Sequence, residues 1–509
     1  MTMAGAAAGR VNPVIVVAVV LSAMLEVLDS TIVNVALPHI QAAFGATTDQ
    51  ATWILTSYIV SAVVIMPLTG FVARRVGRRR LILTAVTGFA TMSVMCGLSW
   101  SLETIVVFRL AQGMFGAFLI PLSQSILFDA FPREKRGQAM AVFGLGVVVA
   151  PVLGPTVGAI LTEYFSWRMV FFVNLPVAAM ALLLLAGELP DDETEDVKID
   201  WAGLAMLAIG IGCLQFVLDQ GETKDWLSSR VIQVAVIASL LGTLGFIIHA
   251  VTKKGAIVDL RLFADRNFAL SNLIIAGFAV SLFGGIAILP TFVQSLLDYP
   301  VIESGHLFIP RGIAAGASMV VTGSVLVTRF DPRVLAGLGL LLTAIGNFML
   351  GMLNLNAGFW QLAWPGAVSG LGMGLVFVPL SILAFESISQ RRQDEASGLF
   401  NVTRQLGSSV GIALVGTWVV RGLQTNTANL SQNVTPYNPA AQAYLEPLGL
   451  TPDSAQGAAI LGQEISRQAE LISYLTVFNN LGLLALATIP LLFFCKAPKP
   501  GTQATVHAH

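Results

Sequence analysis

The sequence predicts an all-α integral membrane protein, and three observations support that fold class. Hydrophobic residues make up 55% of the 509 positions and charged residues only 11%, against about 25% charged residues in a typical soluble domain. Fourteen apolar segments are each long enough to cross a bilayer, which requires about 20 residues of helix. Most of the 28 Lys and Arg residues fall in alternate loops between these segments. Because basic loops stay in the cytoplasm, this pattern predicts an even number of crossings with both termini cytoplasmic.

The predicted crossings form two groups of six with one pair between them. The first six are 13–37, 51–72, 80–99, 104–127, 138–161 and 167–187, the pair is 201–218 and 231–251, and the last six are 268–290, 304–328, 333–353, 358–384, 397–420 and 471–495. A glycine followed by a basic turn ends the second crossing of each group, at Gly70 and at Gly323. Such duplicated halves are typical of transporters with a site near the middle of the membrane.

Four regions follow from this grouping. We predict a six-helix bundle over residues 1–190, an acidic linker with two additional transmembrane helices over 191–255, a second six-helix bundle over 256–495, and a cytoplasmic tail over 496–509.

A long polar stretch over residues 422–470, rich in Asn, Gln and Pro, precedes the last crossing on the outer side. Connections of this length are uncommon unless they have a function or are disordered. We therefore expect either a docking surface or a disordered segment, in which an amphipathic helix after Pro452 is a further option.

Two carboxylates, Glu26 and Asp29, lie inside the first crossing. A charge at mid-membrane costs about 2.5–3.5 kcal/mol on insertion scales, so an acid at this depth indicates a functional site. The two acids are about 60° apart around a helix and share a face, with Asn34 near its edge. We assign proton coupling to Asp29 first and leave Glu26 open between a proton role and a substrate role. The alternative is an acid that pairs with an arginine to hold helices together.

The fourth crossing carries Arg109, Gln112 and Gly113 within one arc of the helix. Small residues let helix backbones approach closely, whereas an arginine at this depth needs an anionic partner or water. Either acid of the first crossing would serve as that partner, and Arg109 joins them in the predicted proton-coupling set. The alternative is a set of packing glycines beside an arginine that reaches the membrane surface.

Other polar residues in the crossings are candidate substrate contacts. Arg311 either neutralises an anionic compound or lies near the outer water. Asn401 and Arg404 form a polar stripe near the cytoplasmic end of the thirteenth crossing. With Asn34 and Gln112 these residues make up the predicted substrate-binding set.

The fifth crossing contains Pro151, Gly154, Pro155 and Gly158. Each proline removes a helical hydrogen bond and the glycines permit close contact, so a bend is predicted. The bend is either a conformational hinge at the interface of the two halves or a feature of a kinked packing helix.

Several classes of function lack their characteristic residues. The sequence has no Gly-x-x-x-x-Gly-Lys loop for nucleotide phosphates, so we expect an ion gradient as energy source and no cofactor. The five histidines lack metal-ligand spacing and the three cysteines are far apart in apolar segments, so we expect neither a metal site nor a disulfide. A net charge of −1 gives no basic surplus for nucleic acid.

Five motifs together resemble the fourteen-helix drug:proton antiporters of the major facilitator superfamily. They lie at residues 28–38, 109–113, 154–158, 167–176 and 258–268. The resemblance implies the major facilitator fold, with two helices inserted between its six-helix bundles. It also implies that Arg109 takes part in proton coupling and that residues 154–158 govern bending and limit leak.

The long outer stretch, with Asn-Val-Thr-Pro-Tyr-Asn-Pro at 433–439, resembles the EmrB-type exporters of Gram-negative bacteria. This resemblance implies an inner-membrane location and a tripartite pump, with a periplasmic adaptor of the EmrA type and an outer-membrane channel of the TolC type. One position departs from the superfamily, which usually has an aspartate where this chain has Arg74.

These observations lead us to expect a secondary transporter and not an enzyme. We expect proton-coupled export of hydrophobic toxic compounds, such as drugs, with anionic or fatty-acid-like compounds among the candidates. The alternative is a proton-coupled uptake symporter of peptides or other small molecules, but peptide symporters carry Glu-x-x-Glu-Arg where this chain has Glu-Val-Leu-Asp-Ser at 26–30. A membrane-embedded enzyme or sensor would need nucleophiles or metal ligands that the crossings lack.

Overall fold

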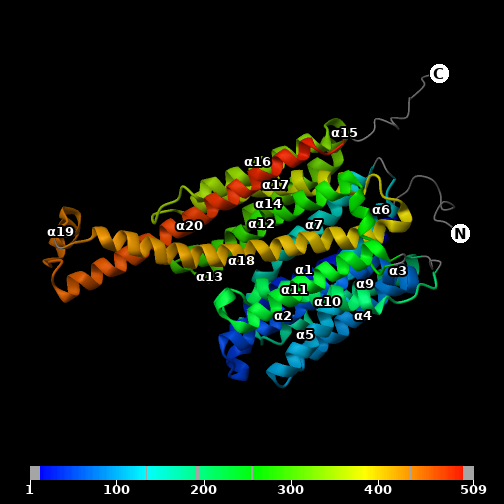
Figure 1. The fold of residues 1–509 in the computed structure, drawn as a ribbon, viewed down its shortest axis with the longest axis horizontal. Coiled ribbons are helices and arrows are strands. Elements are labelled where there is room, and N and C mark those ends of the chain that lie inside the picture. The colour runs from blue at the N-terminus through cyan, green and yellow to red at the C-terminus, as the bar shows by residue number, and fades with distance from the viewer. Residues whose placement is uncertain (1–11, 133–134, 190–193, 254–255, 436, 497–509) are drawn as a thin grey trace.

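A computed structural model describes residues 12–132, 135–189, 194–253, 256–435 and 437–496, and within these ranges the chain forms helices and no strand (Figure 1). The predicted all-α class is therefore confirmed.

The first six crossings follow the predicted order, although several are interrupted by a turn. They consist of α1 (Pro13–Phe44), α2 (Thr48–Ile65) with η2 (Met66–Leu68) and α3 (Thr69–Val76), α4 (Arg78–Gly97), α5 (Leu102–Gly116) with α6 (Leu119–Ala130), α7 (Arg136–Tyr164), and α8 (Met169–Phe172) with α9 (Asn174–Glu188).

The ends of α1 carry the expected capping residues. The Asn12 side chain accepts a hydrogen bond from the Val14 N–H, and Pro13 occupies the first turn, where its missing N–H leaves nothing unpaired. The helix ends at Gly45, whose φ of 60° lies in the left-handed region that glycine adopts without strain.

The inserted pair, α10 (Trp201–Gln220) and α11 (Arg230–Thr252), packs as a hairpin whose first helix contacts both α2 and α18. Asp200 joins the two helices at one end, because it accepts from the Gly203 N–H at 3.2 Å and pairs with Lys253 at 2.8 Å. Burial disfavours the charged form of Asp200, but hydrogen bonds from Lys253, Gly203 and His249 outweigh burial and lower the pKa of this carboxyl to about 2.

The last six crossings are α12 (Arg266–Ser295); α13 (Val301–His306) with α14 (Phe308–Val321), the π-helical η6 (Thr322–Leu326) and α15 (Val327–Arg329); α16 (Pro332–Leu350); α17 (Phe359–Phe385); α18 (Gln393–Asn433), which follows η7 (Gln390–Arg392); and α20 (Ala455–Phe493).

The helix count agrees with a multi-pass membrane protein. Thirteen helices in the described ranges are long and apolar enough to cross a membrane, and the 29-residue α7 covers the remaining predicted crossing, 138–161. The total of fourteen and the cytoplasmic termini stay predictions. The predicted domain limits also stay predictions, since residues 190–193, 254–255 and 497–509, which include nearly all of the predicted tail, lie outside the described ranges.

Residues 422–470 are mostly helical, which favours a defined surface over a disordered segment. The 41-residue α18 is about 60 Å long at 1.5 Å per residue, about twice the apolar thickness of a bilayer. The outer parts of α18 and α20 project together from the bundle, with α19 (Pro439–Leu445) and η8 (Glu446–Leu448) at the tip (Figure 1). We call this projection, residues 421–470, the stalk. The helices that contain the last two predicted crossings, 397–420 and 471–495, extend beyond these spans at their outer ends, because α18 continues to Asn433 and α20 begins at Ala455.

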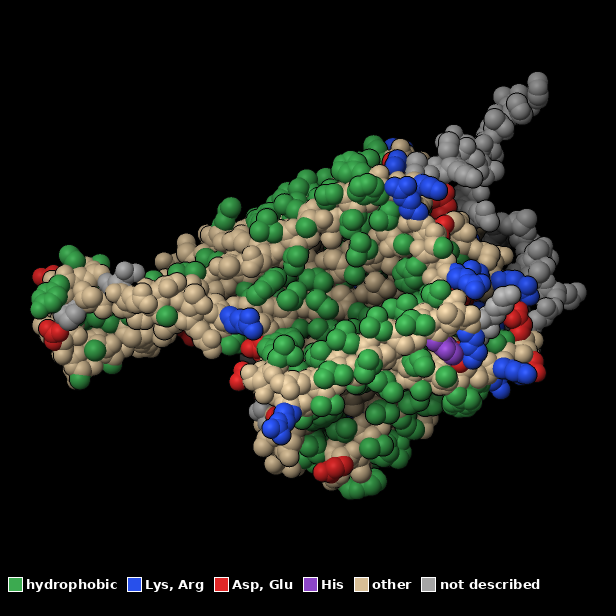
Figure 2. Space-filling model, viewed as in Figure 1, with side chains coloured by type: hydrophobic (Ala, Val, Ile, Leu, Met, Phe, Trp, Pro, Cys, Tyr) green, Lys and Arg blue, Asp and Glu red, His purple; other side chains and the backbone are tan. Residues whose placement is uncertain are grey.

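The two halves meet at the end of the bundle where Lys and Arg side chains gather (Figure 2). We call it the basic end, and the positive-inside rule assigns it to the cytoplasm. Here the Phe128 and Phe385 rings lie 4.9 Å apart, and α18 contacts η2 so closely that a Cβ on Gly398 would lie 2.8 Å from the Met66 carbonyl oxygen. The structure is therefore closed toward the predicted cytoplasmic side.

Candidate functional site

The two acids of α1 lie in different surroundings, although they are less than one turn apart. Asp29 is completely buried, whereas Glu26 is 8% exposed. Asn34 lies on an exposed part of the same helix and donates its amide to the Ser30 carbonyl at 3.1 Å.

Asp29 joins three helices of the first half. Nη1 of Arg109, on α5, donates to Asp29 Oδ2. Asp29 Oδ1 accepts from Gln112 Nε2 at 3.0 Å and from Asn174 Nδ2, on α9, at 2.7 Å. All four side chains are 0% exposed. A buried carboxylate with three donors is fully satisfied, so this group is fixed in its present position.

Arg109 is held from its other side by α2. Its guanidinium lies 4.1 Å from the centre of the Tyr58 ring, and its Nε donates to the Ile54 carbonyl at 3.3 Å. The close approach of α2 and α5 depends on Gly113, because a Cβ there would lie 3.1 Å from the carbonyl carbon of Tyr58. The predicted pairing of Arg109 with an acid of the first crossing is thus confirmed for Asp29.

Glu26 faces the other half of the molecule. In the described part of the chain it has no hydrogen-bond partner, and its charge interacts with that of Arg404 on α18. Arg404 is half-buried and donates from Nε to Asn401 Oδ1 at 3.4 Å. The cation that interacts with the charge of Glu26 therefore belongs to the second half.

The side chains of Asn401 and Gln112 are buried and hydrogen-bonded to other side chains of the protein. Asn401 is 1% exposed and donates to Gln124 Oε1 of α6 at 2.7 Å, which ties the two halves together. Gln112 belongs to the Asp29 cluster and also accepts from Arg109 Nη1 at 2.9 Å. Both positions were predicted as substrate contacts; the structure places them in buried polar networks in this closed arrangement, and their substrate role stays a prediction.

Arg311 is a cation without an anion. Its Nη2 donates to Ser369 Oγ on α17 at 2.9 Å, its Nε is buried without a partner, and no carboxylate pairs with it within the described ranges. A Cβ on Gly370 would lie 3.2 Å from the Ala315 backbone nitrogen, so α14 and α17 leave little space around this side chain. A half-buried cation without a carboxylate partner favours an anionic ligand.

The predicted hinge in the fifth crossing is a continuous helix. α7 runs unbroken through Pro151, and Gly154 and Gly158 face α1, where a Cβ on Gly158 would lie 3.0 Å from the Ile32 side chain. The glycines thus serve close packing against α1. The side chain of Pro155 lies outside the described part of the structure, and the hinge role stays a prediction.

A network that sequence reasoning missed closes the basic end. Arg74 Nη1 lies 3.3 Å from Glu395 Oε2, and Arg78 pairs with Asp394 at 2.6 Å and also with Asp129. Asp394 and Glu395 lie in the first turn of α18, where acids interact favourably with the helix dipole. Two acids that follow a basic pair after a single glutamine, at the start of an apolar helix, were the available signal. The unusual Arg74 is therefore matched by an acid from the opposite half.

Asn174 of the Asp29 cluster was also missed as a site residue, although it lies in the motif at 167–176, because its partner Asp29 is 145 residues away in the sequence. No cluster of His, Cys, Asp and Glu within the described ranges is suited to hold a metal ion. The three cysteines are free thiols.

Comparisons with known proteins agree with this architecture. The sequence profile of the Major Facilitator Superfamily matches residues 19–412. The chain is 34% identical over 492 residues to the multidrug export protein EmrB of Escherichia coli K12, and the match covers 95% of each chain. It is 33% identical over 488 residues to the fatty acid resistance protein FarB of Neisseria gonorrhoeae, covering 94% of this chain and 95% of that one.

A solved structure gives the same fold at low sequence identity. The human organic anion transporter MFSD10 (TETRAN) superimposes with a TM-score of 0.61 and 16% identity, over 94% of this chain and 99% of that one. The uptake symporter alternative is not favoured, since the relatives are export and resistance proteins by name. The chain therefore belongs to the Major Facilitator Superfamily and, within it, to the EmrB-type multidrug exporters, which are multi-pass transporters of the bacterial inner membrane and not enzymes.

Proposed function

We propose that this chain exports hydrophobic toxic compounds from the cytoplasm or the inner leaflet in exchange for protons, without a further cofactor. The names of its relatives support the substrate class, which would include drugs and fatty-acid-like compounds. A proton gradient is the proposed energy source because the sequence lacks a phosphate-binding loop for ATP.

The observation that carries the proposal is the contrast between Glu26 and Asp29. Asp29 already accepts three hydrogen bonds, whereas Glu26 is the acid with remaining exposure and interacts with Arg404 from the other half. In the arrangement closed at the basic end, Glu26 takes up a proton from the outer water. Its attraction for Arg404 is then lost, so protonation changes the interaction between the two halves directly.

Asp29 would take part in a second step. A proton can reach Asp29 only if Arg109 moves away from it, because Arg109 and its two amide neighbours occupy the carboxylate. We propose that loss of charge at Glu26, on the same face of α1, allows this exchange. Arg109 then acts as the positioning residue that couples α1 to α2 and α5.

Arg311 is the proposed contact for anionic substrates. It is half-buried, lacks an acidic partner in the described ranges, and lies on α14, whereas both acids lie on α1. A carboxylate on an otherwise apolar compound would neutralise it. Arg404 is the second candidate, since it loses the attraction of the Glu26 charge when Glu26 is protonated.

Purified protein in proteoliposomes with an imposed pH gradient tests proton exchange. After addition of a fluorescent hydrophobic substrate, protons should cross the vesicle membrane in the direction opposite to the substrate. A pH-sensitive dye trapped inside the vesicles reports this proton movement. Glu26→Gln and Asp29→Asn should each abolish this signal, whereas Asp49→Asn, in an exposed ion pair with Lys224, should retain it. Proton exchange that survives in both variants would overturn the proposal, and movement of substrate and proton in the same direction would indicate a symporter.

We further propose that the stalk binds a periplasmic adaptor of the EmrA type, which would connect the transporter to an outer-membrane channel of the TolC type. The stalk extends far beyond the membrane, and Tyr437 and Leu448 at its tip are 88% and 56% exposed. Deletion of residues 426–453 should spare transport in proteoliposomes but abolish co-purification with the adaptor. The milder pair Tyr437→Ser and Leu448→Ser should weaken co-purification, and unchanged adaptor binding in the deletion variant would count against docking at this surface.

A further inference from the structure

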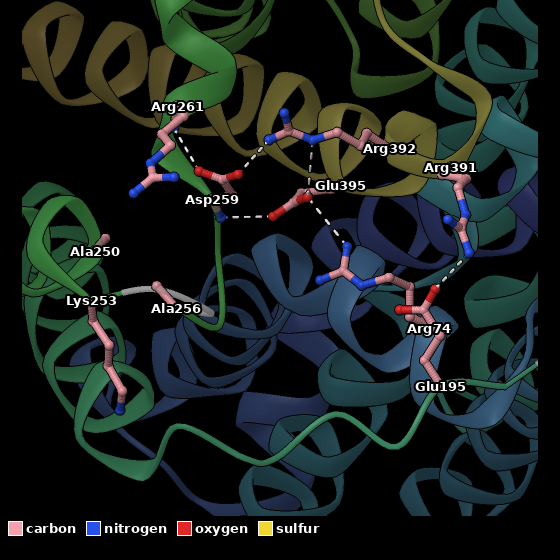
Figure 3. A pocket seen from close by; sticks show the side chains of 10 residues that line it. All are labelled: Arg74, Glu195, Ala250, Lys253, Ala256, Asp259, Arg261, Arg391, Arg392 and Glu395. Atoms are coloured by element: carbon pink, nitrogen blue, oxygen red, sulfur yellow. Dashed lines mark hydrogen bonds and ion pairs between the residues drawn. The ribbon is translucent and has the colours of Figure 1, made fainter.

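A pocket at the basic end lies where three parts of the chain meet. Its volume is about 270 Å³. Arg74 comes from α3 of the first half, Lys253 from the end of α11 in the inserted hairpin, and Arg261, Arg392 and Glu395 from the second half (Figure 3). Neither the site in α1 nor the proposed substrate contacts include this pocket.

The side chains that line the pocket carry more positive than negative charge. Five of them are Lys or Arg and three are Asp or Glu. Each acid is already paired with a lining arginine: Arg74 with Glu395 at 3.3 Å, Arg392 with Asp259 at 2.7 Å, and Arg391 with Glu195 at 3.2 Å. The lining therefore has no carboxylate left for its remaining two cations.

The remaining two cations are Lys253 and Arg261. Lys253 is held from outside the lining by Asp200. The guanidinium of Arg261 has no carboxylate partner in the described part of the chain, since only its backbone N–H bonds to Asp259, at 2.9 Å. Arg391 is also available to a ligand, because the Arg391 and Glu195 side chains are 86% and 48% exposed and an exposed pair of this kind is weak.

These features indicate which chemistry the pocket would recognise. The planar guanidinium of arginine can donate two parallel hydrogen bonds to the oxygens of one phosphate. The volume of the pocket suits one phosphate with a small substituent better than a nucleotide. The pocket lies at the ends of α3 and α11, at the level where lipid headgroups of the inner leaflet are expected. Basic pockets between transmembrane helices on the cytoplasmic side are known to hold anionic headgroups.

We propose that this pocket binds a phosphate group, supplied either by the headgroup of an anionic phospholipid or by a soluble phosphate, through Arg261 with Lys253 and Arg391. The bound phosphate joins the second half to the inserted hairpin, beside the ion pair of Arg74 and Glu395 that connects the second half to the first. Opening of the basic end must separate Arg74 from Glu395 and so takes the pocket apart. A bound phosphate therefore stabilises the arrangement that is closed toward the cytoplasm.

Binding to the full-length protein in a neutral detergent tests the proposal. The probes are short-chain dioctanoyl phosphatidylglycerol, dioctanoyl phosphatidylcholine as the zwitterionic lipid, and inorganic phosphate. The variants are Arg261→Gln and Lys253→Gln, with Arg230→Gln as the matched control, an exposed arginine at the opposite end of α11. Because the three side chains lie at the surface or edge of the fold, all variants should fold like the parent, and their thermal transitions check this.

We expect tighter binding of phosphatidylglycerol than of phosphatidylcholine, and an increase of about tenfold in the Kd for phosphatidylglycerol in Arg261→Gln, with no change in Arg230→Gln. If inorganic phosphate binds with the same dependence on Arg261 and phosphatidylglycerol does not, the pocket takes a soluble phosphate. Equal Kd values for all probes in the parent and in both pocket variants would overturn the proposal. An equal loss in Arg230→Gln would also overturn it, since the effect would then come from net charge alone.

Discussion

Arg74 of α3 forms an ion pair with Glu395 of α18 across the interface of the two halves, with 3.3 Å between Nη1 and Oε2. The basic residue stands where the superfamily usually has an aspartate, and the first turn of α18 supplies the acid. Because Glu395 is 3% exposed and also accepts from the Asp259 N–H at 2.7 Å, its charge is fixed in place. The pair thus connects α3, the segment before α12, and α18 while the basic end is closed.

Reversal of the two charges should preserve this connection. Arg74→Glu places two acids side by side and should lower the stability of the closed arrangement by about 1–2 kcal/mol, as should Glu395→Arg. The double variant Arg74→Glu/Glu395→Arg should recover at least half of the loss. Thermal transitions of the four proteins in detergent form the double-mutant cycle, and a double variant with the summed loss of both singles would refute direct pairing.

The buried pair of Asp29 and Arg109 should be important for stability as well as for transport. Asp29→Asn leaves the buried guanidinium of Arg109 uncompensated, at a cost of about 3–5 kcal/mol. Asp29→Asn/Arg109→Gln should regain much of the thermal stability because no unpaired charge remains, yet it should still fail to export. Export that returns together with stability would show that the pair is only structural.

Two glycines should respond to alanine in opposite directions. Gly113→Ala should destabilise by about 1–3 kcal/mol, because the added methyl meets the Tyr58 backbone and forces α5 away from α2. Gly462→Ala, in the outer part of α20, has nothing within 4 Å of the new methyl and should stabilise by about 0.5–1 kcal/mol through helix propensity. Thermal denaturation of both variants checks the signs, and a neutral Gly113→Ala would contradict the close contact.

The lowered pKa of Asp200 predicts how the thermal stability of the protein depends on pH. Its pKa is lowered from an ordinary value of 3.8 to about 2, so its contribution to stability is full above about pH 4 and is lost as the pH falls toward 2. The gap in thermal transition between the parent and Asp200→Asn should therefore not narrow from pH 7 to pH 5, and it should shrink only below pH 4. A gap that already narrows between pH 7 and pH 5 would contradict this assignment.

Arg311→Gln should change substrate preference more than overall activity. The variant lacks the half-buried cation that has no carboxylate partner, so export of fatty acids and other hydrophobic anions should fall by about tenfold, while neutral compounds should be affected little. Susceptibility of an efflux-deficient host to the two classes of compound measures this, with Arg230→Gln as the control. Equal loss for both classes would indicate a structural role for Arg311.

Much of the fold could be predicted from local sequence. Apolar length, basic turns and caps such as Asn12 and Gly45 act within a few residues, so the order of the helices and the two-halves architecture were accessible. The helical stalk was harder to predict, because its residues are polar and its two helices are stabilised by packing against each other and by the crossings that they continue.

The candidate site was only partly predictable, because its geometry also depends on packing between distant segments. Acids at positions 26 and 29 and Arg109 stand out because charges are rare in membrane helices. The sequence by itself determined that this chain is a helical membrane transporter with an acidic first crossing. Only the tertiary structure decided that Asp29 is enclosed by Arg109, Gln112 and Asn174 while Glu26 faces Arg404. That distinction depends on which helices surround each face of α1, and such neighbours are set by packing between segments far apart in the chain.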